Sequence, residues 1–279
     1  MKNLLIASLF IASATAVAQD LPQPSPKGRV EQVVGLTNVS IDYSRPSAKG
    51  RMIFGDLVPY DKVWRTGANG CTTIEIDGPV LVEGSKLAAG IYSLFTIPSE
   101  ENWVIIFNSD TSLWGEEDRK DSLDVLSVKV PRRKSSEFTE TFTIAFEEVK
   151  DDKARIDLRW ENILASVNIH ADATDKALVN IKLAMAKPDA GFRVYASSAR
   201  FLVDRNIMRG EALEWAEKSV SMERKFWNVY TLALALAQNG KYPQAITAAE
   251  ESMKLAQEAK YDAYVKMNKE RIEEWKMKR

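Results

Sequence analysis

Arginine and aromatic side chains gather in one segment of the chain, residues 44–70, where they could line a ligand pocket. Guanidinium groups bind carboxylate or phosphate through planar pairs of N–H donors. The rings of Trp and Tyr add a flat apolar face that suits a sugar. We therefore expect an anionic or sugar-like ligand to bind side chains of this segment, namely Arg45, Tyr60, Trp64, Arg65 and Asn69.

A structural role for the same segment is the alternative, and the residue types favour it. Phe54 and Trp64 are expected in a hydrophobic core, because a long segment with this many apolar residues is not disordered. The arginines would then pair at the surface with Asp56 and Asp61, as exposed ion pairs are common.

Two tryptophans, Trp103 and Trp114, flank the stretch from Phe107 onward and could together form a stacking platform for a glycan. The platform requires that both rings are exposed. A Trp on an alternating strand, as Trp103 is, belongs more often to the core. The acidic residues that follow Trp114, within 116–124, are mixed with Arg119 and Lys120, which indicates a solvated loop.

The motifs of common enzyme and cofactor classes are missing from the sequence. One Cys and one His exclude an internal disulfide and a Cys/His zinc cluster. There is no Gly-x-Ser-x-Gly, Walker loop, GxGxxG or HExxH motif. A His with a nearby carboxylate, as His170 has in Asp172, is the smallest arrangement that can act as a general base. A surface or interdomain contact is the favoured role of His170. We assign no catalytic residue, metal or cofactor.

The charge balance and the first residues bear on partners and location. With 38 Lys and Arg against 39 Asp and Glu, no electrostatic reason for a nucleic-acid partner exists. Residues 1–18 combine a basic start, a short apolar run and Ala16-Val17-Ala18, which indicates a cleaved signal peptide. We expect an exported protein, periplasmic or secreted, that is not embedded in the membrane after cleavage. An uncleaved anchor is the alternative. Cys71, a free thiol in that compartment, is expected to be buried.

Strand signals fill residues 28–171, after a Pro-rich leader at 19–27. Short runs rich in Val, Ile, Thr and aromatics alternate with Gly, Pro, Asn and Asp. We expect about ten strands, at 29–34, 39–43, 71–76, 80–82, 90–98, 103–107, 125–130, 138–147, 154–160 and 164–169. Alternation of polar and apolar residues predicts an antiparallel β-sandwich or jelly-roll-like domain.

The composition changes near residue 172, where Pro and Gly become rare and helical spacing begins. A helix at 173–187 and a breaker sequence form a linker region, 172–191. Helices are then expected at 192–204, 209–221, 225–238 and 243–258, with a capping helix at 261–277. Ala, Glu and Ser recur at an offset of 33 between 212–219 and 245–252. Residues 192–279 therefore resemble tetratricopeptide repeats, and an ordinary helical bundle is the alternative.

Several longer sequence motifs resemble those of a family of exported Bacteroidota proteins, the domain-of-unknown-function family numbered 2911. They include Tyr43-Ser-Arg-Pro, Leu57-Val-Pro-Tyr, Val63-Trp-Arg-Thr-Gly-Ala-Asn and Ala89-Gly-Ile-Tyr-Ser-Leu-Phe-Thr-Ile-Pro, in order between residues 21 and 168. Asp61 stands where the family usually has Gly, which alters the charge of the 44–70 segment. The resemblance implies an exported protein with a β-rich domain, sometimes followed by tetratricopeptide-like repeats, and no assigned activity.

The function predicted from these features is non-enzymatic. An α+β protein of two domains would act as a binding or scaffold protein, with its helical repeats offered to a protein or peptide partner. The alternative is an enzyme that acts on an envelope glycan or ester, with its site in the 44–70 loop. That alternative predicts a deep pocket joining the loop to a carboxylate or to His170.

Overall fold

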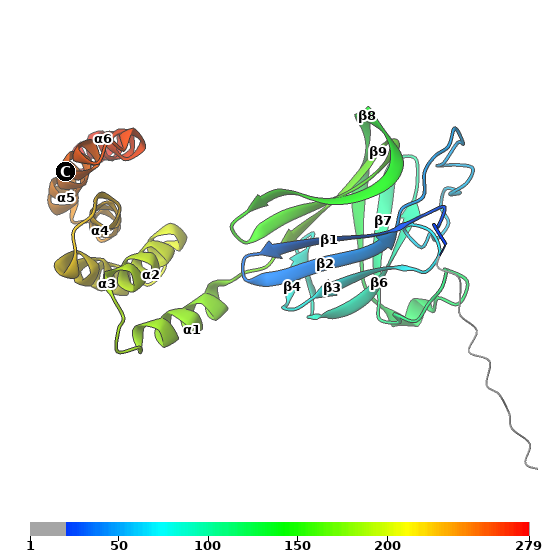
Figure 1. Ribbon diagram of the computed structural model, residues 1–279, viewed down its shortest axis with the longest axis horizontal. Coiled ribbons are helices and arrows are strands. Elements are labelled where there is room, and N and C mark those ends of the chain that lie inside the picture. Colours follow the sequence, from blue (N-terminus) through cyan, green and yellow to red (C-terminus); the bar gives the residue numbers. More distant parts are fainter. Residues whose placement is uncertain (1–20, 279) are drawn as a thin grey trace, which may run out of the picture. The chain divides into compact units, whose positions relative to one another are not determined.

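The computed structural model describes residues 21–278 of the chain, so the expected signal peptide at 1–18 lies outside the described residues. The chain forms two compact units with the boundary between Ala173 and Thr174 (Figure 1). An antiparallel sheet makes up the first unit and six helices make up the described part of the second. This arrangement confirms the predicted α+β class.

The first unit contains one sheet. Its strands differ in length, and every strand pairing is antiparallel. Its order is β1-β2-β3-β6-β7-β8-β9-β4-β5. The strands are β1 (Lys27–Val34), β2 (Thr37–Ser44), β3 (Thr72–Ile76), β4 (Val80–Val82), β5 (Ser85–Leu87), β6 (Gly90–Pro98), β7 (Asn102–Asn108), β8 (Asp124–Lys150) and β9 (Lys153–His170). A short 3-10 turn, η1 (Asp121–Leu123), precedes β8.

Strand alternation places apolar residues on the inner face, as in β3, where residues 72, 74 and 76 are buried. The centre of this core is aromatic: Phe54, Trp64, Trp103, Phe142 and Trp160 are all buried. The ring centroids of Trp64 and Trp160 are stacked 5.8 Å apart, and those of Phe54 and Trp103 are 5.1 Å apart. The structural alternative for Phe54 and Trp64 is therefore correct.

β9 is sharply bent near Glu161, where its register with β8 shifts on both sides, which explains why two strands were expected where the structure has one element. The hydroxyl of Ser166 donates to the Asp157 carboxylate at 2.7 Å, although nine residues separate them. A straight strand would hold them about 30 Å apart. Glu161 lies near the middle with φ 51°, a left-handed conformation that bends the strand at the bulge.

The chain just after β2 runs along β8 and closes the sheet around its core. Ser47 and Thr141 form an antiparallel bridge. On either side of it, Ala48 N–H donates to the Glu140 carbonyl at 2.7 Å and Phe142 N–H donates to the Pro46 carbonyl at 2.8 Å. In Figure 1 the long β8 and β9 arch over β1 and β2. The sheet is thus strongly curled, and most of the 44–70 segment is part of its structure.

The second unit is helical. It comprises α1 (Thr174–Met185), α2 (Phe192–Arg205), α3 (Arg209–Met222), α4 (Phe226–Gln238), α5 (Tyr242–Glu258) and α6 (Asp262–Lys276). Each predicted helix is present with its ends shifted by two residues or fewer. Asn206 ends α2 in the left-handed conformation, and Pro243 lies in the first turn of α5, where its missing N–H costs nothing. Within residues 21–278, no helix is long and apolar enough to cross a membrane.

The sequence repeat corresponds to a repeated contact between helices. Ser219 in α3 is buried and donates to the carbonyl of Phe192, the first residue of α2, at 2.9 Å. Ser252, 33 residues later in α5, is also buried and donates to the carbonyl of Phe226, the first residue of α4, at 2.7 Å. Likeness to the tetratricopeptide family stays a prediction, but α2–α3 and α4–α5 are two copies of one hydrogen-bonded helix pair.

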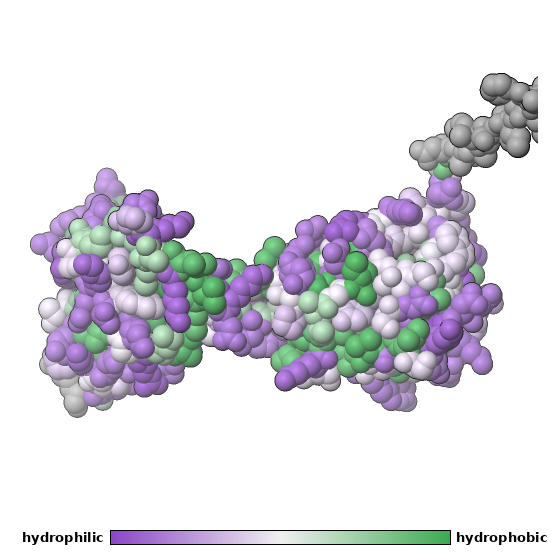
Figure 2. Space-filling model, turned by 90° about the horizontal axis from the view of Figure 1, so that it is seen from below, coloured by the Kyte–Doolittle hydropathy of each residue, from purple (hydrophilic) through white to green (hydrophobic). Residues whose placement is uncertain are grey.

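Apolar side chains reach the surface on both units (Figure 2). In α1 only Ala177 is buried, whereas Val179 and Leu183, one turn apart, are 57% and 63% exposed. In the sheet unit the largest exposed ring is that of Trp114, at 73%.

Candidate binding sites

Arg65 contacts a different carboxylate from the one expected. Its backbone position is set by Trp64, whose N–H and carbonyl pair with Thr96 at 2.8 and 2.9 Å. The Arg65 Nε donates to Glu116 at 2.9 Å and its Nη1 donates to the Asn69 carbonyl at 3.0 Å. The structure thus brings Arg65 and Asn69 together, as the pocket prediction required, but Glu116 is the ion-pair partner. The expected pairing with Asp56 and Asp61 is wrong for Arg65.

Trp64 and Tyr60 offer little free ring surface to a ligand. The Trp64 side chain stacks on Trp160, and its Nε1–H donates to the Gly67 carbonyl at 3.0 Å. Tyr60 is half-buried and packs against the core. Its ring lies so close to Gly55 that a Cβ there would be 3.0 Å away, and Gly55 also has a φ of 95°. Both rings therefore have structural roles.

Arg45 and Asn69 bind different parts of the sheet unit. Arg45 reaches β8, where its Nε donates to the Phe142 carbonyl at 3.2 Å and its Nη2 to Thr143 Oγ1 at 2.8 Å. The Asn69 amide donates to the Ser25 carbonyl at 3.1 Å and to Ser44 Oγ at 3.3 Å. Each of the five predicted side chains thus has a packing or hydrogen-bonding role within the sheet unit, and ligand binding by them stays a prediction.

The two tryptophans of the expected platform are separated by burial. Trp103 is 1% exposed and belongs to the core, whereas Trp114 is 73% exposed. The predicted glycan platform of both rings is therefore wrong, and Trp114 is available alone. No signal in the sequence marks which Trp is exposed except the alternating strand around Trp103.

The acidic loop after Trp114 is held in place by Arg119. The Arg119 side chain is 8% exposed and pairs with Asp121 and Asp124, and its guanidinium lies 5.6 Å from the centroid of the Phe95 ring. Asn108 adds a hydrogen bond to Asp124 at 2.7 Å. The loop was expected to be solvated; instead its centre covers the outer face of β6. Such cover explains why Phe95 is fully buried outside the main core.

Asp157 in β9 is the most buried ionised group of the sheet unit that has charged partners on both sides. Arg155 and Arg159 flank it, each with an N–O distance of 2.7 Å, and Ser166 donates to it. Burial raises the pKa of Asp157, but hydrogen bonds from Arg155, Ser166 and Arg159 outweigh burial, so its pKa lies below the usual value. Its complete burial between two arginines was not predicted from the sequence.

His170 is the last residue of β9 and pairs with Leu81 of β4 in the sheet. His170 therefore holds a position within the strand ladder. Among the described residues, no group of three or more His, Cys, Asp or Glu side chains is placed to hold a metal ion.

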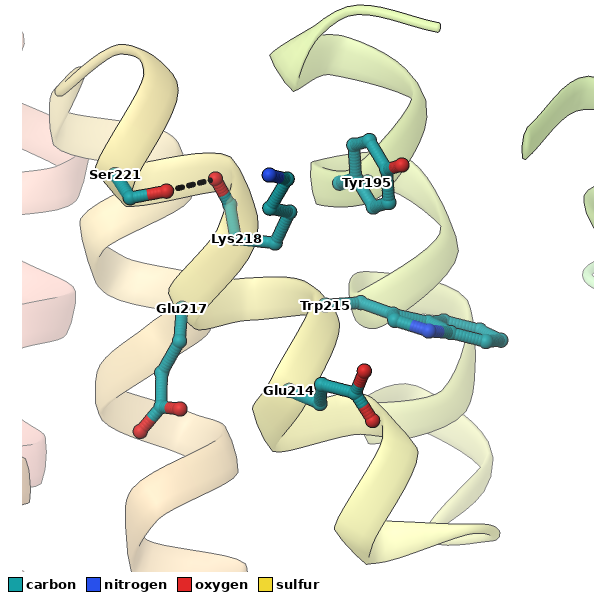
Figure 3. Close-up of a pocket in the computed structure, with 6 residues that line it drawn as sticks. All are labelled: Tyr195, Glu214, Trp215, Glu217, Lys218 and Ser221. Atoms are coloured by element: carbon teal, nitrogen blue, oxygen red, sulfur yellow. Dashed lines mark hydrogen bonds between the residues drawn. The ribbon is translucent and has the colours of Figure 1, made fainter. Parts of the chain in front are cut away.

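A groove lies on the surface of the helical unit between α2 and α3 (Figure 3). It has a volume of about 520 Å³ and is lined by Tyr195, Glu214, Trp215, Glu217, Lys218 and Ser221. The Tyr195 and Trp215 side chains are half-buried. In the close-up Trp215 extends from α3 across the front of α2, the Lys218 side chain lies on the side of α3 that faces Tyr195, and Glu217 points away from both rings. The groove is thus lined by the two aromatic rings and by charged side chains next to them.

Charge pairing distinguishes this groove from the 44–70 segment. Glu214, Glu217 and Lys218 are exposed, and none of the three forms an ion pair with another residue of the described chain. Arg65, in contrast, is already paired. The sequence predicted a partner-binding helical region but named none of these residues. Helical spacing would place Glu214 and Lys218 on one face of α3, one turn apart.

Comparison with known proteins identifies one family. The sequence profile of the family described as "Protein of unknown function (DUF2911)" matches residues 25–169, just over half of the chain. Neither the curated proteins nor the solved structures gave a match.

Proposed function

The chain belongs to the DUF2911 family, whose description assigns no activity, and we propose that it is a non-enzymatic binding protein whose helical unit holds a segment of a protein partner. The binding site in this proposal is the groove between α2 and α3, which we call the α2–α3 groove. The sheet unit serves as the folded support of the same chain.

The observation that carries the proposal is the combination of half-buried rings and unpaired charges in the α2–α3 groove. Tyr195 and Trp215 supply the kind of aromatic surface that is enriched where proteins bind one another. Glu214 and Lys218 have no ion-pair partner in the described chain, so a ligand can pair with them without breaking an existing contact.

The occupant that fits is a peptide segment with one apolar side chain between charged residues of both signs. The apolar side chain would pack against Tyr195 and Trp215, where burial of a side chain of Leu or Phe size contributes about 2 kcal/mol. A basic residue would pair with Glu214 and an acidic one with Lys218. A groove of about 520 Å³ accommodates a few side chains, so a short segment rather than a whole domain is the expected contact.

An array of peptides that vary in the central apolar residue and its flanking charges tests this proposal. The probe is residues 19–279. We expect peptides with a Leu or Phe flanked by Lys and Asp to bind, and Trp215→Ala to abolish their binding. Because Trp215 also packs on the helical core, a second variant is needed. Lys218→Glu should shift the preference from the acidic to a basic flanking residue.

Lys254→Glu is the matched control. Lys254 is exposed on α5, so its substitution makes the same change of charge away from the groove. Equal effects of Lys218→Glu and Lys254→Glu on the peptide preference would contradict the proposal. So would binding that survives Trp215→Ala unchanged.

Export to the cell envelope is part of the same proposal and is supported by the sequence alone. The pattern of residues 1–18 supports a signal peptide with cleavage after Ala18. The resemblance to exported Bacteroidota proteins and to tetratricopeptide repeats supports a partner in that compartment. Sequencing of the N-terminus of the protein from cell fractions tests it. A chain that keeps Met1 and remains in the cytoplasm would contradict export.

A further inference from the structure

Trp114 is a large ring held at the surface by a loop that is fixed in place. Its side chain is 73% exposed, although burial of a Trp is strongly favourable. The main chain around it is tied to the segment 65–71. An exposed ring on a braced loop is placed for contact with something outside the chain.

Each of the four residues 113–116 receives a contact from Arg65 or Cys71. The N–H of Cys71 donates to the Leu113 carbonyl and its thiol to the Gly115 carbonyl, each at 3.4 Å. Arg65 donates to the Trp114 carbonyl at 3.4 Å and pairs with Glu116 at 2.9 Å. Arg65, predicted to bind a ligand, instead supports the loop that presents Trp114.

Two glycines lie beside these side chains. A Cβ on Gly70 would lie 3.8 Å from the Trp114 ring, an ordinary van der Waals contact, so the ring lies next to Gly70. A Cβ on Gly115 would lie 3.1 Å from the Arg65 guanidinium carbon, so a side chain there would press on the arginine. One edge of the indole therefore lies next to Gly70 while most of the ring faces solvent.

Negative charge dominates the loop around this ring. Residues 110–124 contain six acidic residues and two basic ones. Arg119 pairs with Asp121 and Asp124, and Arg65 pairs with Glu116. Glu117 and Asp118 are exposed and form no ion pair with any residue in the range that the structure describes. This charge disfavours an anionic ligand and complements a cationic one.

We propose that Trp114 is a binding site for a cationic side chain, a Lys or Arg of a basic peptide, with Glu117 and Asp118 as its counter-charges. The face of an indole attracts a cation more strongly than other aromatic side chains do. Arg65 is a positioning residue in this site, because it acts on the cation only through the loop. This site lies in the sheet unit and does not depend on the α2–α3 groove.

Titration of residues 19–279 with a tetralysine peptide tests the proposal. The indole N–H resonance of Trp114, assigned by its loss in Trp114→Phe, reports the contact. We expect saturable shifts of this resonance, and at least a tenfold loss of affinity in Trp114→Ala and in the double variant Glu117→Gln/Asp118→Asn. Affinity should also fall as salt is raised from 20 to about 300 mM, because exposed charges are screened.

Met52→Ala is the control variant, since Met52 is an apolar side chain of the same unit that is 66% exposed. It should leave the affinity for tetralysine unchanged. The proposal is overturned if tetralysine leaves the Trp114 resonance unmoved, or if a neutral oligosaccharide such as cellohexaose shifts it and tetralysine does not. An equal loss of affinity in Met52→Ala would also overturn it.

Arg65→Gln tests the positioning role. In this variant we expect the backbone ¹⁵N heteronuclear NOE of residues 113–116 to fall and the affinity for tetralysine to drop several-fold. A structural role alone would lower the melting temperature and leave the NOE of this loop and the affinity unchanged, and that result would refute positioning by Arg65.

Discussion

Asp157 shows how a single buried charge contributes to the stability of the sheet unit. Its carboxylate is completely buried between Arg155 and Arg159, which remain partly exposed. Removal of the charge would leave two guanidinium groups next to a neutral amide. We predict that Asp157→Asn lowers the free energy of unfolding at pH 7 by about 3 kcal/mol, the lower end for a broken buried pair because both arginines contact water.

The pH dependence of this contribution follows from the lowered pKa of Asp157. A group whose pKa is lower in the folded protein stabilises it above the pKa of the unfolded state, about 3.9, and this stabilisation is lost as pH falls through the folded value. Urea unfolding of the two proteins should therefore differ at pH 7 and converge below about pH 4. The exposed Asp118→Asn is the control. A difference that persists unchanged at pH 2 would contradict this account.

Cys71 gives a second prediction for a single residue. Burial raises the pKa of its thiol to about 11, with Arg65 lowering it and Glu116 and Asp110 raising it. At pH 8 the reactive thiolate is then about 100-fold scarcer than for an ordinary thiol with a pKa near 9. Alkylation by iodoacetamide, followed by mass spectrometry, should be slower than that of a cysteine peptide by about this factor. Equal rates would show that the thiol is open to solvent and to ionisation.

Each of the two repeated serines of the helical unit contacts a buried asparagine amide, and the two amides differ in their hydrogen bonding. Asn228 of α4 and Asn268 of α6 each donate to the repeated serine, Ser219 and Ser252, at 3.0 and 2.9 Å. The Asn228 side-chain oxygen also accepts from Lys225 N–H at 2.8 Å, whereas the Asn268 oxygen is buried without a partner. We predict that Asn228→Ala costs about 2 kcal/mol and Asn268→Ala about 1 kcal/mol, since more bonds are lost at Asn228.

Denaturation of both variants by urea, followed by helical circular dichroism, measures these costs. Ser221→Ala is the control: its hydroxyl is exposed and donates only within α3. If Asn268→Ala proved the more damaging of the two, the second helix pair would not be a weaker copy of the first.

At the scale of elements, the helices were predictable from sequence and the long strands were not. Helix ends are marked locally, by Gly191 before α2 and by Pro243 in α5, so each helix was placed within two residues. The separate strands expected at 154–160 and 164–169 are the two parts of β9, because the strand bends at Glu161 while both parts stay paired with β8. β5 was missed, since two of its three residues are polar and exposed. Phe138, the first residue of the strand expected at 138–147, is 57% exposed.

The candidate sites were less predictable, because pairing and exposure are set by residues far apart in sequence. Arg65 and Glu116 are 51 residues apart, so no local spacing indicated that the arginine was already occupied. The α2–α3 groove joins Tyr195 and Trp215, which lie on different helices. The sequence predicted a binding role for the helical region, but the lining residues depend on which helix faces are left uncovered.

At the scale of the whole molecule, residues 21–278 contain two hydrophobic cores that share no residue, one in each unit. We predict that damage to one core stays in its own unit. Leu202→Ala, at a fully buried position of α2, should cost about 3 kcal/mol. Hydrogen exchange of the full chain should then be faster in residues 174–278 and unchanged in β1–β9. Faster exchange throughout the sheet would show that the chain unfolds as one cooperative unit.

The most direct test of the proposed function is hydrogen exchange of the full chain with and without a peptide selected on the array. The account predicts slower exchange in α2 and α3, within residues 192–222, and loss of that protection in Trp215→Ala. Protection confined to residues 109–124 around Trp114, or to the 44–70 segment, with none in α2 and α3, would contradict the central claim that the helical unit holds the partner.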